Sequence, residues 1–221
     1  MTNIPASQMA SHGINRWLAV CILLAELCSA FSLHAQCLQE GDLVFSCSDG
    51  GNAITDVTNG VGNLPIDHVA IAHRIGGADG PLYVIEAIKP VVCITPIDTF
   101  IANNPSPVII GRVNVEIDVR SSVRQALMMV GKPYDDLFLP GDSAVYCSEL
   151  VQMNYVDNSG NLIFQTIPMS FHDSSLNVTG YWREFYGRRG MPVPEGQPGS
   201  NPGELSRRPQ VTIIGKYPIG L

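Results

Sequence analysis

A series of short runs rich in β-branched residues occupies residues 41–113, and it constrains the fold more than any other feature of the sequence. Turn-forming residues separate the runs, notably GGADG at 76–80 and Lys89-Pro90. Such runs predict strands joined by short turns, and therefore an antiparallel meander. The predicted strands are GDLVFSC (41–47), HVAIAHRI (68–75), LYVIEAI (82–88), VVCITPI (91–97) and VIIGRV (108–113).

The pattern changes from strand to helix after the last of these runs. In VRSSVRQALMMVGKPYD (119–135) the apolar residues recur at helical spacing, and Gly131 ends the predicted helix. Residues 187–209 are rich in proline and glycine and are expected to form a long ordered wrap, because a closing strand, VTIIGKYPI (211–219), follows them. The sequence therefore predicts an α+β fold, an antiparallel sheet packed against a few helices.

The N-terminus has the layout of a secretory signal peptide. Arg16 precedes the apolar run WLAVCILLA (17–25), and small residues follow, so we place cleavage after Ala35. The run is shorter than the roughly 20 apolar residues that span a bilayer, so no stable membrane insertion is expected once the signal is removed. The alternative is a buried N-terminal helix. Export predicts a periplasmic or extracellular protein, with residues 36–221 as one domain.

Charge and cysteine content exclude several classes of function. The net charge of −7 argues against nucleic acid or an anionic membrane surface as the main partner. The cysteines outside the predicted signal are Cys37, Cys47, Cys93 and Cys147. An even number in an exported protein allows disulfides, such as Cys37–Cys47. No C-x-x-C pair is present, so zinc-ribbon and thioredoxin-like sites have no support.

Cys147, in the stretch YCSELVQMN, is the candidate nucleophile. A second helix is expected to begin near Ser143 or Tyr146 and to end near Tyr155, with Asp142 and Ser143 as candidate caps. A cysteine in the first turn of a helix is close to unpaired N–H groups and to the positive end of the helix dipole, which stabilise a thiolate. The alternative is a buried structural cysteine or half of a disulfide.

His68 and Glu86 are the candidate partners of this thiol. Strand alternation places His68, Ala70 and Ala72 on one face, where the small alanines leave room for the cysteine helix. Glu86 lies in an apolar strand, and a buried carboxylate needs a partner such as the imidazole. The alternatives are a structural histidine and a glutamate on a wet face. A cysteine with a base and an orienting group is the arrangement of papain-like catalysis.

These motifs together resemble the permuted branch of the NlpC-type papain-like amidases, the YiiX/YaeF-like group. The resemblance rests on GDLVF, DHVAIAHRI, LYVIEAI, GKPYDDLF and YCSELVQ, and covers roughly residues 40–156. It implies a circularly permuted papain-like fold in which the cysteine helix follows the strands. It also implies that Cys147 is the nucleophile, His68 the general base and Glu86 the orienting residue. Tyr134 is then expected to contact the substrate or the oxyanion, and Tyr146 is expected to contact the substrate.

The resemblance implies a cysteine amidase or peptidase that uses an acyl-enzyme and requires no metal or cofactor. Export favours short peptides or peptidoglycan-derived peptides as substrates. The same site can serve a lipid thioesterase or acyltransferase, which would need an apolar access channel. A non-catalytic module that binds a peptide or glycan is the other alternative. Trp182, Phe185 and Tyr186 are expected to form a satellite core, with an open alternative that one of them lines the cleft.

Overall fold

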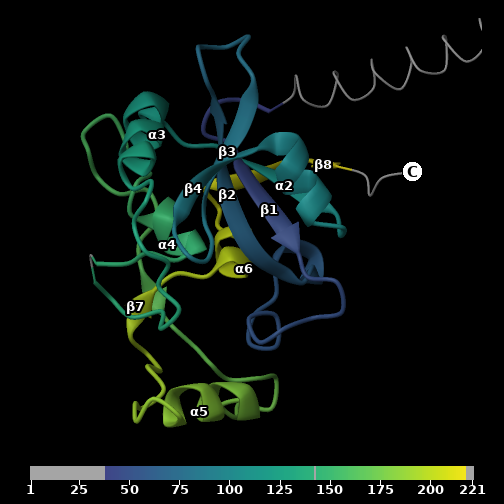
Figure 1. Ribbon diagram of the computed structural model, residues 1–221, viewed down its shortest axis with the longest axis vertical. Coiled ribbons are helices and arrows are strands. Elements are labelled where there is room, and N and C mark those ends of the chain that lie inside the picture. Colours follow the sequence, from purple (N-terminus) through teal and green to yellow (C-terminus); the bar gives the residue numbers. More distant parts are fainter. Residues whose placement is uncertain (1–37, 142, 218–221) are drawn as a thin grey trace, which may run out of the picture. The chain divides into compact units, whose positions relative to one another are not determined.

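A six-stranded antiparallel sheet organises the part of the chain that the computed structural model describes, residues 38–141 and 143–217 (Figure 1). The predicted signal peptide, and with it Cys37, lies outside the described residues. The strand order is β4-β3-β2-β1-β5-β8. The first four strands form a meander as predicted, but the fifth predicted strand, β5, does not continue it, because it pairs with β1 and not with β4. Their bounds are β1 Leu43–Cys47, β2 Ile66–Arg74, β3 Leu82–Ala87, β4 Val92–Pro96, β5 Val108–Val113 and β8 Val211–Tyr217.

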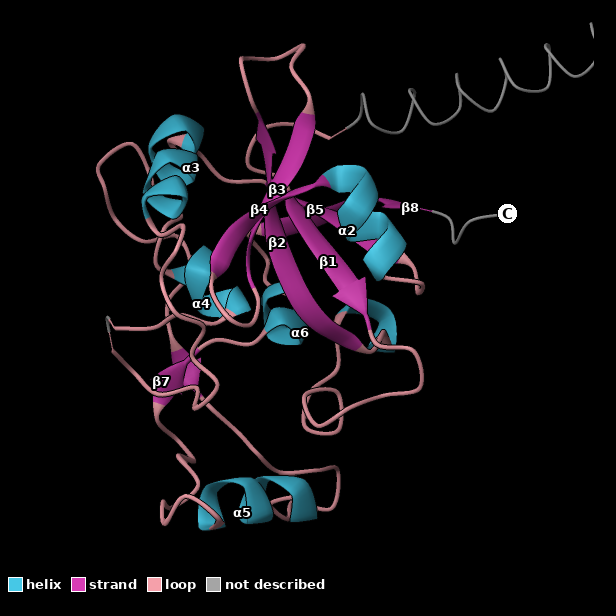
Figure 2. Cartoon of the chain, viewed as in Figure 1, coloured by secondary structure: helices cyan, strands magenta, loops and turns pink. Residues whose placement is uncertain are grey.

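Short helices and one small ribbon complete the described fold. The ribbon pairs β6 (Ile167–Pro168) with β7 (Pro198–Gly199). The helices are η1 Val61–Asn63, α2 Ile97–Asn103, α3 Val119–Met128, α4 Cys147–Gln152, α5 Gly180–Gly187 and α6 Pro202–Leu205. In the view of Figure 2 the strands of the sheet pass between α2 and α4. No helix within the described ranges is both long and apolar enough to cross a membrane.

The predicted strands and the first helix are confirmed with small changes at their ends. α3 ends at Met128, and Gly131 follows with φ +88°, a left-handed conformation that glycine adopts without strain. The second helix is shorter than predicted. It begins at Cys147, and the residue before it, Tyr146, is the N-cap. Ser143 is therefore not the cap, and Asp142 lies outside the described residues.

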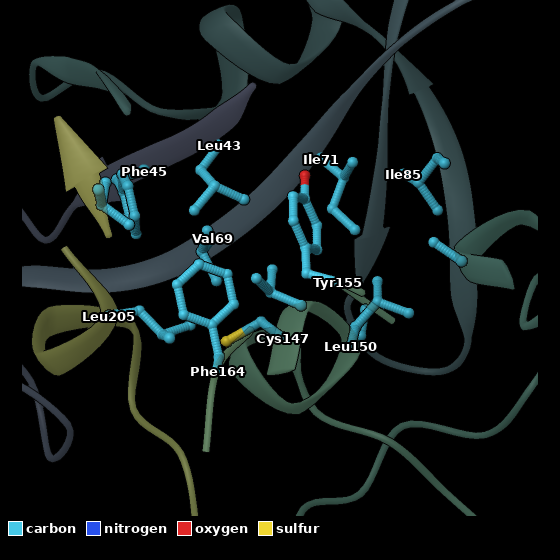
Figure 3. Packing of buried hydrophobic residues seen from close by; sticks show 14 of the residues in the cluster. Leu43, Phe45, Val69, Ile71, Ile85, Cys147, Leu150, Tyr155, Phe164 and Leu205 are labelled. Carbon is cyan, nitrogen blue, oxygen red and sulfur yellow. The ribbon is translucent and has the colours of Figure 1, made fainter. Parts of the chain in front are cut away.

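The main hydrophobic core lies between one face of the sheet and the helix that carries Cys147 (Figure 3). Val69 and Ile71 of β2 belong to this core together with Cys147 and Leu150. The prediction that the cysteine helix packs on the alanine face of β2 is therefore wrong. The larger β-branched side chains form the interface because they bury more apolar area than alanine does.

Residues 187–209 form an ordered segment that includes α6, which contacts β2 and α4. Gly199 of this segment lies so close to the cysteine helix that a Cβ there would stand 2.9 Å from the hydroxyl of Tyr146 and 2.6 Å from Cγ of Met169. Only glycine fits this approach without a shift of its neighbours.

A second apolar cluster lies around α5 and confirms the predicted satellite core. Its buried members are Met169, Phe171, Trp182, Phe185 and Tyr186. Two hydrogen bonds fix it to other segments: Trp182 Nε1 donates to the Ala53 carbonyl, and the Tyr186 hydroxyl donates to the Leu137 carbonyl. The cluster therefore holds the loops around residues 53 and 137 in place.

Candidate active site

Cys147 is the first residue of α4 and is only 3% exposed. Leu150 and Val151, on the same short helix, are fully buried in the main core and fix the helix against the sheet. Figure 3 shows Cys147 among these core side chains. Within the described chain, Cys47, Cys93 and Cys147 are free thiols. The thiol of Cys147 is thus held at a helix start by well-packed neighbours.

His68 and Glu86 meet across the neighbouring strands β2 and β3. Nε2 of His68 lies 2.8 Å from Oε2 of Glu86. The His68 side chain is 17% exposed, and Glu86 is buried at 4%. A second hydrogen bond, from the Thr95 hydroxyl at 2.5 Å, reaches the other oxygen of Glu86. Both oxygens of this buried carboxylate are therefore bonded, as a buried charge requires.

The thiol of Cys147 joins this pair through the imidazole. Burial lowers the pKa of His68, but hydrogen bonds with Cys147 and with Glu86, and the charges of both groups, raise that pKa to about 10. Nε2 is engaged by Glu86, so Nδ1 is the ring nitrogen that remains for the sulfur. These contacts favour the protonated imidazole, which lies between the Cys147 thiol and the Glu86 carboxylate.

Two features fix the position of His68. The strand pairing shifts between Ser46↔His68 and Cys47↔Ile66, which leaves Asp67 as the extra residue of a β-bulge. Bulges increase the local twist and re-aim the side chains beside them. On the other side, the ring of Phe100 in α2 lies 6.0 Å from the imidazole, measured between ring centroids.

Tyr134 and Tyr146 both lie at the site, in different ways. Burial raises the pKa of Tyr134 above its ordinary range, and the charge of Cys147 is the next contribution. Tyr134 also forms a β-bridge with Val145, two residues before Cys147. The Tyr146 hydroxyl accepts a hydrogen bond from the Ser200 backbone N–H at 3.0 Å. Burial raises the pKa of Tyr146 to about 12, so the phenol stays protonated.

A narrow cavity of about 30 Å³ opens beside Cys147, roughly the volume of one water molecule. Its walls are mostly apolar and come from the satellite core, and they include Phe138 and Trp182. A larger cavity of about 350 Å³ shares these two residues and is also lined by Tyr134. Trp182 is therefore a residue of the satellite core that also lines the cleft, as the sequence analysis allowed.

Thr95 and Phe138 are residues of this site that sequence reasoning missed. Thr95 lies two residues after Cys93 in a predicted strand, so the two side chains are expected on the same face of the sheet. That pattern could have identified it. Phe138 follows the GKPYD motif in a loop, and no pattern in the sequence indicates where its ring points.

Within the described parts of the chain, no group of three or more His, Cys, Asp or Glu side chains is arranged to hold a metal ion.

Comparisons with known proteins agree with this geometry. A family model described as the permuted papain-like amidase enzyme, YaeF/YiiX, C92 family, matches residues 37–215. The uncharacterized protein YiiX of Escherichia coli K12 is 30% identical over 139 residues, which is 61% of this chain and 67% of that protein. A crystal structure of the metalloprotein yiiX from Escherichia coli O157:H7 superposes with a TM-score of 0.64 at 23% identity, over 81% of this chain and 97% of that one. The chain therefore belongs to the permuted papain-like amidases of the YaeF/YiiX group, a family of cysteine amidases and peptidases.

Proposed function

We propose that the protein is an exported cysteine hydrolase that cleaves amide bonds through Cys147, His68 and Glu86. The observation that carries the proposal is the contact set of His68. Its Nε2 bonds Glu86 at 2.8 Å, and its other side faces the Cys147 thiol at the start of a helix. A nucleophile, a proton carrier and an orienting group thus lie in one connected chain.

The first step of the proposed reaction is attack by the Cys147 thiolate on the amide carbonyl carbon. The backbone N–H of Cys147, in the first turn of α4, is the proposed donor to the developing oxyanion, because the first N–H groups of a helix have no partner within it. The protonated imidazole of His68 gives its proton to the nitrogen of the leaving amine. The C–N bond then breaks and leaves a thioester on Cys147.

The second step releases the acyl group. Neutral His68 takes a proton from water, the resulting hydroxide attacks the thioester carbonyl, and the Cys147 thiolate leaves. Glu86 exchanges no proton with the substrate in either step. Its carboxylate holds the ring orientation of His68 and stabilises the imidazolium that exists before attack and after water is deprotonated.

Short peptides, including those derived from peptidoglycan, are the proposed substrates. The support is the signal-like pattern of residues 1–35, which would deliver the enzyme to the periplasm or beyond. The net charge of −7 argues against nucleic acid as a partner. The connected set of Cys147, His68 and Glu86 favours an enzyme over a non-catalytic module, because binding alone does not require it.

A second candidate function is hydrolysis or transfer of an acyl group from a thioester or lipid. The specific observation in its favour is the apolar wall of the cavity at Cys147, formed by side chains such as Val57, Phe171 and Trp182. The wall is apolar, as an acyl group requires, but the cavity of about 30 Å³ would have to widen to admit one. The sequence alone did not reveal this wall. The chemistry at Cys147 would be the same, with a thiol or alcohol as the leaving group.

The test compares the wild-type protein with Cys147→Ala and with the matched control Cys47→Ala, which removes another free thiol. Each protein is incubated with peptidoglycan stem peptides, N-acyl amides and acyl thioesters. Acid quenching and mass spectrometry then detect an acyl group on Cys147. We expect turnover and the acyl adduct in the wild type and in Cys47→Ala, and neither in Cys147→Ala. Equal turnover in Cys147→Ala would sink the proposal. The class of substrate that acylates Cys147 decides between the two candidate functions.

A further inference from the structure

Thr95 is in direct contact with the carboxylate that orients His68. Its Oγ1 lies 2.5 Å from Oε1 of Glu86. The antiparallel register of β3 and β4 pairs Glu86 with Cys93 and Val84 with Thr95. Because side chains alternate along a strand, Thr95, Cys93 and Glu86 share one face of the sheet. The contact therefore follows from the strand pairing and does not depend on a loop.

The direction of these hydrogen bonds is fixed by their chemistry. An ionised carboxylate only accepts, so the single proton of the Thr95 hydroxyl is donated to Glu86. The Cys93 sulfur lies 3.6 Å from the Thr95 oxygen. Since the Thr95 proton is already used, the Cys93 thiol is the donor in that contact. The chain runs from Cys93 through Thr95 to one oxygen of Glu86, whose other oxygen accepts from His68.

The hydroxyl has a geometric consequence for the site. A carboxylate held at one oxygen can still rotate about its last bond, whereas one held at both oxygens cannot. Glu86 is 4% exposed, so little water is available to replace a lost donor, and an unpaired buried oxygen is costly. Without Thr95, the carboxylate would lose the orientation that meets Nε2 of His68.

We propose that Thr95 is a positioning residue of this active site, which fixes the Glu86 carboxylate in the orientation that supports His68. The inference rests on the proposed function as regards turnover, but its effect on the Cys147–His68 pair can be measured without any substrate. Thr95 acts through Glu86 and touches no reacting atom.

The test measures the rate at which iodoacetamide alkylates Cys147 between pH 5 and pH 11, read by mass spectrometry of the Cys147 peptide. Thr95→Val keeps the β-branched shape and removes the hydroxyl, and Thr95→Ser restores the hydroxyl. We expect Thr95→Val to slow alkylation at neutral pH by about tenfold, the usual effect of losing a hydrogen bond to a charged group. The pH at which the alkylation profile changes because His68 loses its proton should also be lower in Thr95→Val, since the protonated imidazole is stabilised less.

Two comparisons separate positioning from packing. Thr95→Ser should recover most of the wild-type rate and profile, and Thr99→Val, on the exposed side of α2, should match the wild type. A wild-type profile in Thr95→Val overturns the inference. So does a Thr95→Ser variant that is as impaired as Thr95→Val, since that result indicates a packing role. If Thr95→Val fails to fold, Thr95→Ala gives the same comparison.

The outcomes also separate this inference from the proposed function. A protein that alkylates with a His68-dependent profile but hydrolyses none of the substrates contradicts the hydrolase proposal and leaves the role of Thr95 intact. A protein that hydrolyses amides with an unchanged Thr95→Val profile contradicts only the role of Thr95.

Discussion

His68 and Glu86 are 18 residues apart in the sequence, and their side chains meet at 2.8 Å across two antiparallel strands. The short turn between β2 and β3 makes this pairing local in the chain. Cys147 comes from the separate helix α4, which packs against the same strands. The site therefore joins a rigid pair within the sheet to a thiol brought by a helix. Each part can be tested separately.

The charge of Glu86 should matter more than its shape. Glu86→Gln keeps a side chain of the same size but removes the negative charge that stabilises the imidazolium. We expect alkylation of Cys147 at neutral pH to fall by about tenfold to a hundredfold, the range for a lost bond to a charged group. The measurement is the iodoacetamide rate at pH 7.

A matched control exists elsewhere in the same sheet. Nδ1 of His73 lies 2.7 Å from Oε1 of Glu40, a second histidine–glutamate pair. Glu40→Gln should leave the alkylation of Cys147 unchanged. Equal losses in Glu86→Gln and Glu40→Gln would show that the effect is general destabilisation and that Glu86 has no special role.

Protein stability should depend on pH through His68 in a defined direction. Burial lowers the pKa of His68, but hydrogen bonds with Cys147 and Glu86 raise it from 6.5 to about 10. Because the pKa is raised in the folded state, protonated His68 adds to the free energy of unfolding. This contribution is fully present below pH 6.5 and is lost as the pH rises to about 10. The difference in Tm between the wild type and His68→Gln should therefore be largest near pH 6 and shrink toward pH 10. Thermal unfolding at several pH values checks this, with His73→Gln as the control. A difference that grows with pH would contradict the assignment.

The sheet and the His68–Glu86 pair could be predicted from the sequence because both are encoded locally. The short β-branched runs fix the strands, and a glutamate inside an apolar strand such as LYVIEAI needs a buried partner. The neighbouring strand offers His68. In the same way, the switch to helical spacing predicts α3. These signals depend only on residues that are near each other in the chain.

The remaining features depend on contacts that no local pattern records. The helix α2 follows a strand without a break, and its Ile97 and Phe100 are buried by contacts of the fold. The bulge at Asp67 is visible only once the strands are paired. The face of β2 that receives α4 was predicted wrongly, since the small alanines suggested room while Val69 and Ile71 provided the packing surface.

Gly199 should be needed for the placement of the cysteine helix. A Cβ at this position would stand 2.9 Å from the Tyr146 hydroxyl and 2.6 Å from Cγ of Met169. Gly199→Ala should therefore displace Tyr146, which precedes Cys147, and lower the free energy of unfolding by about 1–3 kcal/mol, the usual cost of overpacking. Chemical denaturation and the alkylation rate of Cys147 are the measurements. Gly187→Ala is the control, because nothing lies within 4 Å of its Cβ position. Equal stability of the two variants would contradict the argument.

Phe138 should limit the size of the groups that reach Cys147. Its backbone has φ +52°, which is unfavourable for an aromatic residue. The Asp135 carboxylate accepts from the N–H groups of Leu137 and Leu139, both at 2.9 Å, and so holds the loop in this form. The ring packs 5.2 Å from Tyr146 and 5.7 Å from Trp182, measured between centroids. Phe138 thus stands where the narrow cavity at Cys147 and the larger cavity share a wall.

Removing the ring should join the two cavities. Phe138→Ala is expected to raise the alkylation rate of Cys147 by the bulky reagent N-benzylmaleimide severalfold more than the rate with iodoacetamide, which is small. Tyr181→Ala is the control, because Tyr181 lines only the larger cavity and is half exposed. A ratio of the two rates that stays at the wild-type value in Phe138→Ala would show that access to Cys147 is set elsewhere. A ratio that rises equally in both variants would point to general loosening around α5, since both residues contact Trp182 there.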